Sequence, residues 1–549
     1  MKRFVALLFA GSLICGCQPQ TGSTSSVNSP PASAPKLVSG LGPVHHPVST
    51  VSSDAQRYFD QGLAYIYAFN HAEAVRSFAR AAELDPKLAM AHWGQAVALG
   101  PNINAPEIDP AAAKAAYDAA QRAVALCANA SPAERAYINA VARRYAPNPN
   151  ADLQKLAYDY KMAMGEVMKR FPDDLDAATL YAESAMNLHP WKLYTKDGKP
   201  EDGTEEIVKV LEWVLGRSAN HVGANHYYIH ATEASTTPER ALPSARRLPT
   251  LAPAAGHLVH MPAHVYIRTG DYAAAIAANE QAARVDEKYI SCCGPRGGVY
   301  PAMYYSHNLH FLAVAAAMGG KSKEARDAAN KLAAHLNPVI DQMPMFEAMG
   351  AVPVLIAARQ ALWGEVLKWP EPKENRHASR AVWHFARGMA HAAMKDIGPA
   401  LIEHDLYTAE AAKAKDLSMG NNKAAQVFKI ADHLLSGKIF AARGDNDAAR
   451  RELEMAIKAQ DQLEYDEPSA FPWPVREALG AHLLRAGDPA AAETIFRQDL
   501  TRTPNNPRSL YGLSESLKAR GRHFDSAEAL KQFETRWAGA DIKLRIEDF

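Results

Sequence analysis

Residues 55–86 read AQRYFDQGLAYIYAFNHAEAVRSFARAAELDP, and this stretch decides the fold of the chain. Gly62, Ala74 and Ala81 are small residues at positions where two consecutive helices would touch, so they let the helices approach closely. Pro86 ends the second helix, because proline cannot donate the helical hydrogen bond. The stretch therefore predicts two antiparallel helices that pack on each other.

The same spacing recurs far along the chain. The 12-residue interval between Gly62 and Ala74 returns at Gly388 and Ala400, Gly437 and Ala449, and Gly480 and Ala492. Alternating strand patterns are nearly absent from the 549 residues. A chain of this length is too long for one compact core, but it suits a solenoid in which each repeat packs only on its neighbours. We therefore expect an all-α solenoid of helical hairpins.

This spacing resembles the tetratricopeptide repeat, a helical hairpin with a period of about 34 residues. The resemblance extends over most of residues 55–540. It implies a right-handed superhelix whose concave groove binds a peptide or a partner protein. More narrowly, HMPAHVYIRTGDY at 260–272 and YYSHNLHF at 304–311 look like segments of a group of large bacterial tetratricopeptide-repeat lipoproteins.

Histidines recur in step with the repeat. His226 and His230 recur as His260 and His264 after 34 residues, and His257 and His260 recur as His307 and His310 after 50 residues. Residues three, four or seven apart share one face of a helix, so we expect one stripe of imidazoles on three successive helices. The predicted ligands are His226, His230, His257, His260, His264, His307 and His310.

Imidazoles in this number suit copper or zinc, held as one ion or as two. Glu233 beside them would instead favour zinc, iron or manganese, or would act as a base. Arg268 could bind an anionic substrate group or form a surface salt bridge. No hydrolase signature such as HExxH is present. The catalytic residues are therefore not determined, with Glu233 and Arg268 as candidates.

Three functions remain open from the sequence. The first is a metalloenzyme, such as an oxidase of a small molecule or peptide. The second is a scaffold without enzyme activity that binds a peptide or partner protein in its groove. The third is a metal-binding or metal-delivery lipoprotein. Nucleic acid is not expected as a partner, because 60 Lys and Arg residues balance 60 Asp and Glu residues.

The N-terminus resembles a lipoprotein signal peptide. Lys2 and Arg3 precede an apolar run over residues 4–13 that is too short to span a bilayer. Residues 14–17 read ICGC and look like a bacterial lipobox with Cys17 as the lipidated residue. We expect a lipid-anchored protein of the cell envelope, at the outer membrane and facing the periplasm.

The chain divides into six predicted segments. They are a signal peptide (1–17), a disordered tether (18–50), N-terminal helices (51–175), a central block with the histidine-rich groove (176–340), a proline-rich connection (341–380) and C-terminal repeats (381–549). The pairing of Cys127, Cys292 and Cys293 stays open, as does the role of the loop at 465–476, which could cover a groove or simply connect helices.

Overall fold

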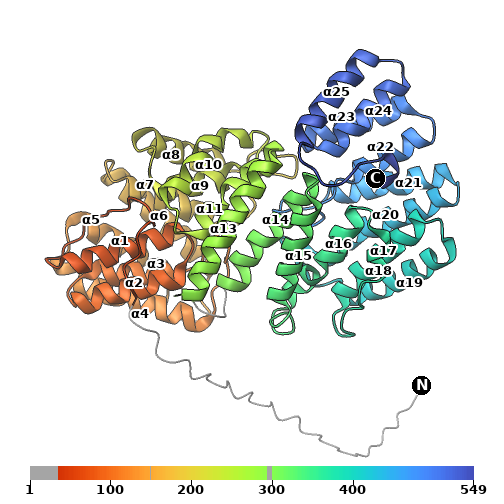
Figure 1. Ribbon diagram of the computed structural model, residues 1–549. Helices are drawn as coiled ribbons and strands as arrows, with labels where there is room; N and C mark the ends of the chain where they lie inside the picture. Colours follow the sequence, from red (N-terminus) through yellow and green to blue (C-terminus); the bar gives the residue numbers. More distant parts are fainter. Residues whose placement is uncertain (1–34, 149, 293–299) are drawn as a thin grey trace, which may run out of the picture.

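The computed structural model describes residues 35–148, 150–292 and 300–549. It is built almost entirely of helices, which pair in sequence order into hairpins (Figure 1). None of the described helices combines the length and the apolar character needed to cross a bilayer. The all-α superhelix of hairpins predicted from the sequence is the observed architecture.

The helices up to the middle of the chain form one half of the molecule. They are α1 (Ser53–Tyr67), α2 (His71–Leu84), α3 (Ala89–Leu99), α4 (Pro110–Leu126), α5 (Pro132–Val141), α6 (Leu153–Arg170), α7 (Leu175–Met186), α8 (Thr204–Arg217), α9 (Val222–Thr232), α10 (Leu242–Leu251), α11 (Gly256–His260), α12 (Pro262–Thr269) and α13 (Tyr272–Cys292).

The second half follows from a π-helical turn at Pro301–Tyr305. Its helices are α14 (Ser306–Met318), α15 (Ser322–Leu336), α16 (Val352–Arg359), α17 (Trp363–Val366), α18 (His377–Ala393), α19 (Ile397–Ala414), α20 (Ala424–Ala442), α21 (Asn446–Gln460), α22 (Val475–Arg485), α23 (Pro489–Arg502), α24 (Pro507–Ala519) and α25 (His523–Arg536). The strands β1 (Ser418–Met419) and β2 (Asn422–Lys423) pair antiparallel, with Ser418 opposite Lys423.

Close helix contact at glycine is the packing rule of these hairpins. Phe78 of α2 lies against Gly62 and Gly94, where an added Cβ would come within 2.7 and 2.4 Å of its ring. Phe496 of α23 fills the same place between Gly480 and Gly512. Side chains larger than hydrogen would push these helices apart. The glycine spacing in the sequence therefore sets the distance between helices.

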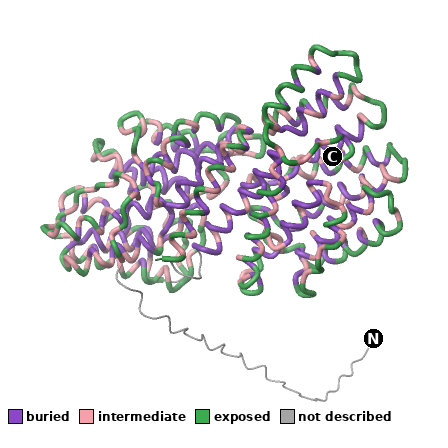
Figure 2. The backbone as a smooth tube through the Cα atoms, viewed as in Figure 1, coloured by how far each residue is buried: buried purple, intermediate pink, exposed green. Residues whose placement is uncertain are grey.

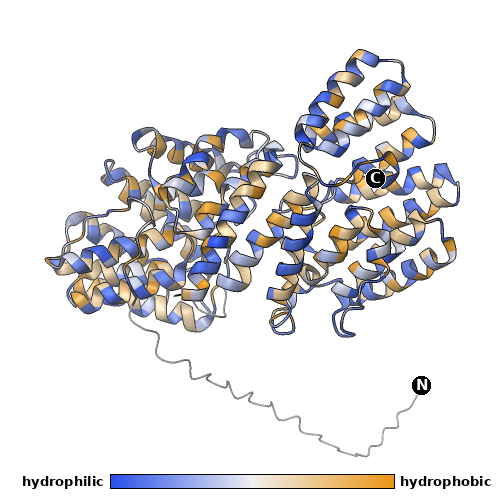
Figure 3. Cartoon of the chain, viewed as in Figure 1, coloured by the Kyte–Doolittle hydropathy of each residue, from blue (hydrophilic) through white to orange (hydrophobic). Residues whose placement is uncertain are grey.

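Two large apolar clusters form the interior. One extends from Leu41 through the helices before α13 and includes Tyr300 and Tyr304, and the other extends from Tyr272 to Phe549. Figure 2 shows the buried backbone running through the middle of both halves, and Figure 3 shows apolar and polar residues alternating around the helices. Such alternation is expected for helices that pack on one face and meet water on the other.

Two of the predicted segments differ in the structure. Residues 35–50, assigned to a disordered tether, pack on the helices, with Leu41 buried and Val38 N–H donating to Gln61 at 2.7 Å. Their backbone is held because it finds acceptors on α1. Residues 341–380, assigned to a connection, contain α16 and α17. Residues 18–34 and Cys17 lie outside the described residues.

The central helix expected over 256–269 is interrupted. It forms as α11 and α12, because Pro262 lacks the N–H that would continue the hydrogen-bond ladder. Cys127 carries a free thiol and Cys292 is disulfide-bonded, so the Cys127–Cys292 bridge that the sequence left open is not formed. Cys293 lies outside the described residues.

Candidate metal centre

Four helices bring the predicted histidines together. Helix α9 supplies His226 and His230, one turn apart, and α11 supplies His257 and His260. The other two helices complete the set, with His264 on α12 and His307 and His310 on α14. These helices are neighbours in the central part of the superhelix (Figure 1).

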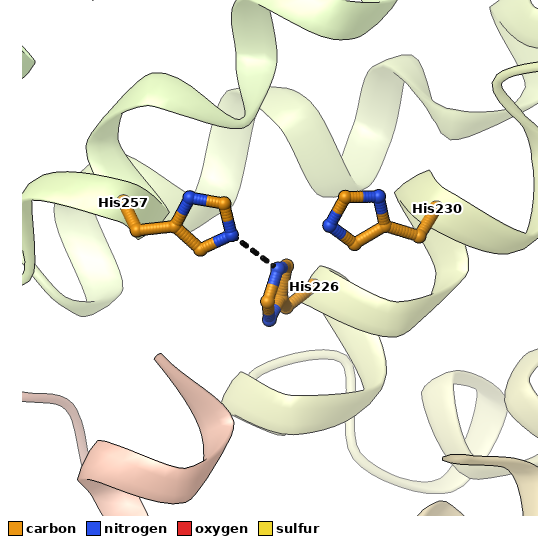
Figure 4. Close-up of side chains that lie close together, drawn as sticks. All are labelled: His226, His230 and His257. Carbon is orange, nitrogen blue, oxygen red and sulfur yellow. Dashed lines mark hydrogen bonds between the residues drawn. The ribbon is translucent and has the colours of Figure 1, made fainter. Parts of the chain in front are cut away.

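Six of the seven imidazoles form two groups of three. The first group consists of His226, His230 and His257, and the second of His260, His264 and His307. Within each group the facing ligand atoms lie within 4.8 Å of one another. Figure 4 shows the three rings of the first group converging on one space. Three nitrogens at such distances could bind one metal ion after small side-chain movements.

The closest contacts join nitrogen to nitrogen. His226 Nε2 lies 3.1 Å from His257 Nε2, and His260 Nε2 lies 2.8 Å from His264 Nε2. The two groups also adjoin, because the rings of His230 and His264 are 5.5 Å apart between centroids. The six imidazoles therefore form one buried cluster that consists of two adjoining groups of three.

His310 does not join the cluster. It follows His307 by one helical turn, and neither of its ring nitrogens belongs to the two groups found among the described residues. Burial lowers the pKa of His310 to about 4. The structure thus brings six of the seven predicted histidines into these groups, and His310 into neither of them.

Outward-facing hydrogen bonds fix the orientation of four imidazoles. His226 Nδ1 donates to the carbonyl of Tyr67 at 2.7 Å, and His260 Nδ1 donates to Asn279 Oδ1 at 2.6 Å. Asn279 Nδ2 itself donates to a carbonyl, which leaves its oxygen for the histidine. Because these partners can only accept, Nδ1 carries the proton, and Nε2 presents its lone pair to the cluster.

Glu233 orients one histidine from each group. Its Oε1 accepts from His230 Nδ1 at 2.8 Å, and its Oε2 accepts from His264 Nδ1 at 2.5 Å. Burial alone would raise the pKa of Glu233, but the two histidines outweigh it and the pKa falls below the usual range. Glu233 therefore remains a carboxylate that bridges the groups from behind. Its oxygens are engaged, so it is not free to act as the base considered from the sequence.

Electrostatics keeps most of the imidazoles neutral. Burial lowers the pKa of five of the six below the ordinary value of histidine; they are His226, His230, His257, His260 and His307. His264 is the exception, since Glu233 and Glu467 outweigh the effect of burial and raise its pKa. Neutral imidazole is the form that ligates metals.

Two buried nitrogens lack partners. His230 Nε2 and His257 Nδ1 have no hydrogen-bond partner within the parts of the chain that the structure describes. Buried polar atoms are almost always paired, because leaving one unpaired costs about 1–3 kcal/mol. A cation at the first group would pair His230 Nε2 directly. The donor set therefore fits a metal ion.

Aromatic rings and a distant loop close the cluster. Phe69 lies 4.6 Å from the His226 ring, and Phe311 lies 4.7 Å from both His260 and His264, between centroids. Phe69 has a φ of 53°, which is uncommon for a bulky residue. Glu467 Oε2 reaches to within 3.2 Å of His264 Nδ1 from the loop before α22. This loop therefore covers the cluster as well as connecting helices.

Little free space remains beside the imidazoles. A cavity of about 20 Å³ touches His230 and Glu233 and is walled by Trp191 and Tyr465. Such a volume holds about one water molecule. Arg268, a candidate for anion binding or a surface salt bridge, instead donates to the carbonyls of Glu233 and Ser235 at 3.0 and 3.1 Å. It ties α12 to the end of α9.

Sequence reasoning missed several residues of this site. Glu467 and Phe69 come from loops about 200 residues away on either side, and Asn279 lies on α13. None of them shares the spacing with which the histidines recur. Asp176 also acts at a distance, since it binds the hydroxyl of Tyr67, whose carbonyl orients His226.

Comparison with known proteins identifies the repeat. A family model described as tetratricopeptide repeat matches residues 55–88 and 259–289, the second of which contains His260 and His264. No curated protein matches the chain. Yeast Tom70 aligns over 88% of this chain and 93% of its own, at 11% identity and a TM-score of 0.29.

A second solved structure gives the same degree of likeness. The human IFIT1 dimer with m7Gppp-AAAA aligns over 89% of this chain and 91% of its own, at 13% identity and a TM-score of 0.35. Neither likeness bears on what this chain binds.

Proposed function

We propose that this tetratricopeptide-repeat protein holds two metal ions, one in each three-histidine group. The observation that carries the proposal is the convergence of six imidazoles into two groups of three, with the ligand atoms of each group within 4.8 Å of one another. Four of these rings bond outward through Nδ1, so that Nε2 faces the group. In the first group the buried His230 Nε2 has no hydrogen-bond partner among the described residues, and a cation would pair it.

Copper or zinc suits these groups best. All six donors are imidazole nitrogens, and Glu233 is occupied by hydrogen bonds from His230 and His264. Imidazole favours these metals over magnesium, calcium or manganese. Histidines that donate their second nitrogen to a carboxylate or carbonyl are typical of metal ligands, since this bond fixes the ring and increases its basicity.

The reaction that this centre supports best is oxidation of a small molecule or peptide. Bound copper would supply one-electron chemistry, and two adjacent ions would together accept two electrons from the substrate, with dioxygen as the final oxidant. The chain excludes water from the centre through Phe69 and Phe311 and holds the imidazoles in place through Glu233. A cavity of about 20 Å³ does not admit an organic substrate, so the loop carrying Tyr465 and Glu467 would have to move during turnover.

A scaffold without a metal is the second candidate. The tetratricopeptide repeats at both matched stretches support it, because this repeat commonly binds proteins or peptides. The buried histidine cluster offers no open groove for a peptide, so such a partner would bind elsewhere on the superhelix. A metal carrier without turnover is the third.

Metal content separates these candidates. Purified full-length protein is stripped with chelator, reconstituted with Cu²⁺ or Zn²⁺, desalted and analysed by mass spectrometry. We expect about two equivalents by the ligand count; less than about a tenth of an equivalent would contradict both the enzyme and the carrier. Oxygen consumption with phenol, amine and peptide substrates then distinguishes these two, since a carrier shows none.

We also propose that the chain is anchored to the outer membrane through a lipid on Cys17. The sequence ICGC at 14–17 supports this address. Cells grown with a palmitate analogue should label the wild type and not Cys17→Ser. Equal labelling of both proteins would rule out this anchor.

A further inference from the structure

The C-terminal helices enclose a second cavity, far in sequence from the histidines. Its volume is about 340 Å³, within the usual range for small-molecule sites. Helices α16, α18, α20 and α22 supply its walls, and residues 547–549 close one side. These four helices lie in the right-hand half of Figure 1.

Most of the wall is apolar. Phe385 and Leu434 contribute side chains from successive helices, and Trp473 and Phe549 contribute aromatic faces. Arg359 lies over the Trp473 ring at 5.0 Å, which holds the indole in place. A ligand here would bury an apolar body of modest size.

The polar part of the wall offers hydrogen-bond donors but few free acceptors. Trp473 is 7% exposed, and its Nε1–H has no acceptor within the described chain. The half-buried Lys438 of α20 also lines the cavity, and no hydrogen bond or ion pair joins it to another described residue. An unpaired buried donor is costly unless a ligand pairs it.

Charge adds to this one-sided arrangement. Five basic side chains line the cavity; they are Arg359, Lys395, Lys438, Arg485 and Arg508. Three acidic side chains oppose them, and Glu477 is already bound by Arg359 and by Asn506 Nδ2. Burial and the neighbouring Arg485 lower the pKa of the Lys438 ammonium, which an anion beside it would reverse.

We propose that this cavity binds a small organic carboxylate with an apolar body, such as an aromatic or medium-chain acid. The carboxylate accepts from Lys438 Nζ and Trp473 Nε1, and the apolar body lies among Phe385, Leu434 and Phe549. The site is independent of the histidine cluster, so its test does not depend on the metal.

Calorimetric titration of the full chain tests the proposal with matched pairs of probes. Octanoate and 3-phenylpropanoate have the charge and the apolar body, while octanol and 3-phenylpropanol have only the body. We expect both acids to bind at least about tenfold more tightly than the alcohols, since a hydrogen bond to a charged group has this strength. Equal affinity of acid and alcohol would overturn the proposal, as would no binding of either acid at about 10 mM.

Two substitutions on α20 locate the site. Lys438→Met should weaken acid binding by roughly tenfold to a hundredfold, while Lys429→Met, at an exposed position of the same helix, should leave it unchanged. Without ligand, Lys438→Met should melt no lower than the wild type, because it removes an unpaired ammonium. If it melts lower, Trp473→Phe replaces it in the same comparison. Wild-type affinity for the acids in both Lys438→Met and Trp473→Phe would refute the assignment. Binding of an acidic peptide but of neither acid would also refute it.

Discussion

Replacing Glu233 by Gln tests the link between the two histidine groups. Glu233 accepts from His230 Nδ1 at 2.8 Å and from His264 Nδ1 at 2.5 Å. A Gln side chain has the same shape, but it offers one acceptor oxygen and one NH₂ donor. One of the two histidines would then face a donor with its own N–H, and its ring would turn or change tautomer.

The expected loss follows from this geometry. Removing a partner behind a metal ligand typically weakens metal binding by about ten- to a hundredfold. Glu233→Gln should therefore weaken the binding of at least one of the two metal ions by that factor. If only one group binds an ion, the loss of affinity should be smaller than for two ions whose ligands share Glu233. Competition titration of metal-free protein against a chelator of known affinity measures both binding steps.

A matched control is available in the C-terminal half. Glu403 Oε2 accepts from His384 Nδ1 at 2.7 Å, and both side chains are buried. Glu403→Gln changes a similar buried pair outside the cluster, so metal affinity should stay within about twofold of the wild type. Unchanged affinity in Glu233→Gln, or an equal loss in Glu403→Gln, would refute the role given to Glu233.

Three further outcomes are expected. Gly256→Ala should lower both the melting temperature and the metal content, because its Cβ would lie 1.8 Å from Asp286 Oδ1 and displace the helix carrying His257 and His260; Gly216→Ala, with nothing within 4 Å, should do neither. His310→Ala should leave the metal content unchanged, whereas His307→Ala should remove about one equivalent, since only His307 belongs to a group. Burial raises the pKa of Asp286 to about 7, so the unfolded chain loses this proton at lower pH than the folded protein does, and stability falls between about pH 4 and pH 7. Asp286→Asn should therefore gain stability relative to the wild type as pH rises from 5 to 8, by about 3 kcal/mol in chemical unfolding; a constant difference across that range would contradict the assigned pKa.

The repeat spacing predicts the fold because its physical cause is local. Glycine at Gly62 and Gly480 meets the ring of Phe78 or Phe496 within the same hairpin, so the sequence interval alone predicts the helix contact. The segment at 35–50 could not be predicted in this way. Its polar and proline-rich composition is typical of a tether, while its order depends on acceptors such as Gln61 on a helix that only the folded chain brings near.

The sequence predicts which histidines come together, but not that they separate into two groups. Helical periodicity places six imidazoles on facing surfaces, but it does not show that α11 divides them, with His257 in one group and His260 in the other. His310 has the same spacing from His307 as His260 has from His257. The spacing alone therefore does not show that only His307 joins a group. Glu467 could not be found from spacing, because it reaches the cluster from a separate hairpin.

The central claim is that each three-histidine group binds its own metal ion. Anomalous diffraction at the copper edge, from crystals of the reconstituted protein, tests it most directly. The account predicts two peaks, one about 2.0–2.1 Å from Nε2 of His226, His230 and His257, and the other at the same distances from His260, His264 and His307. A well-diffracting crystal with no peak inside the cluster, or with peaks only at surface histidines, would contradict it.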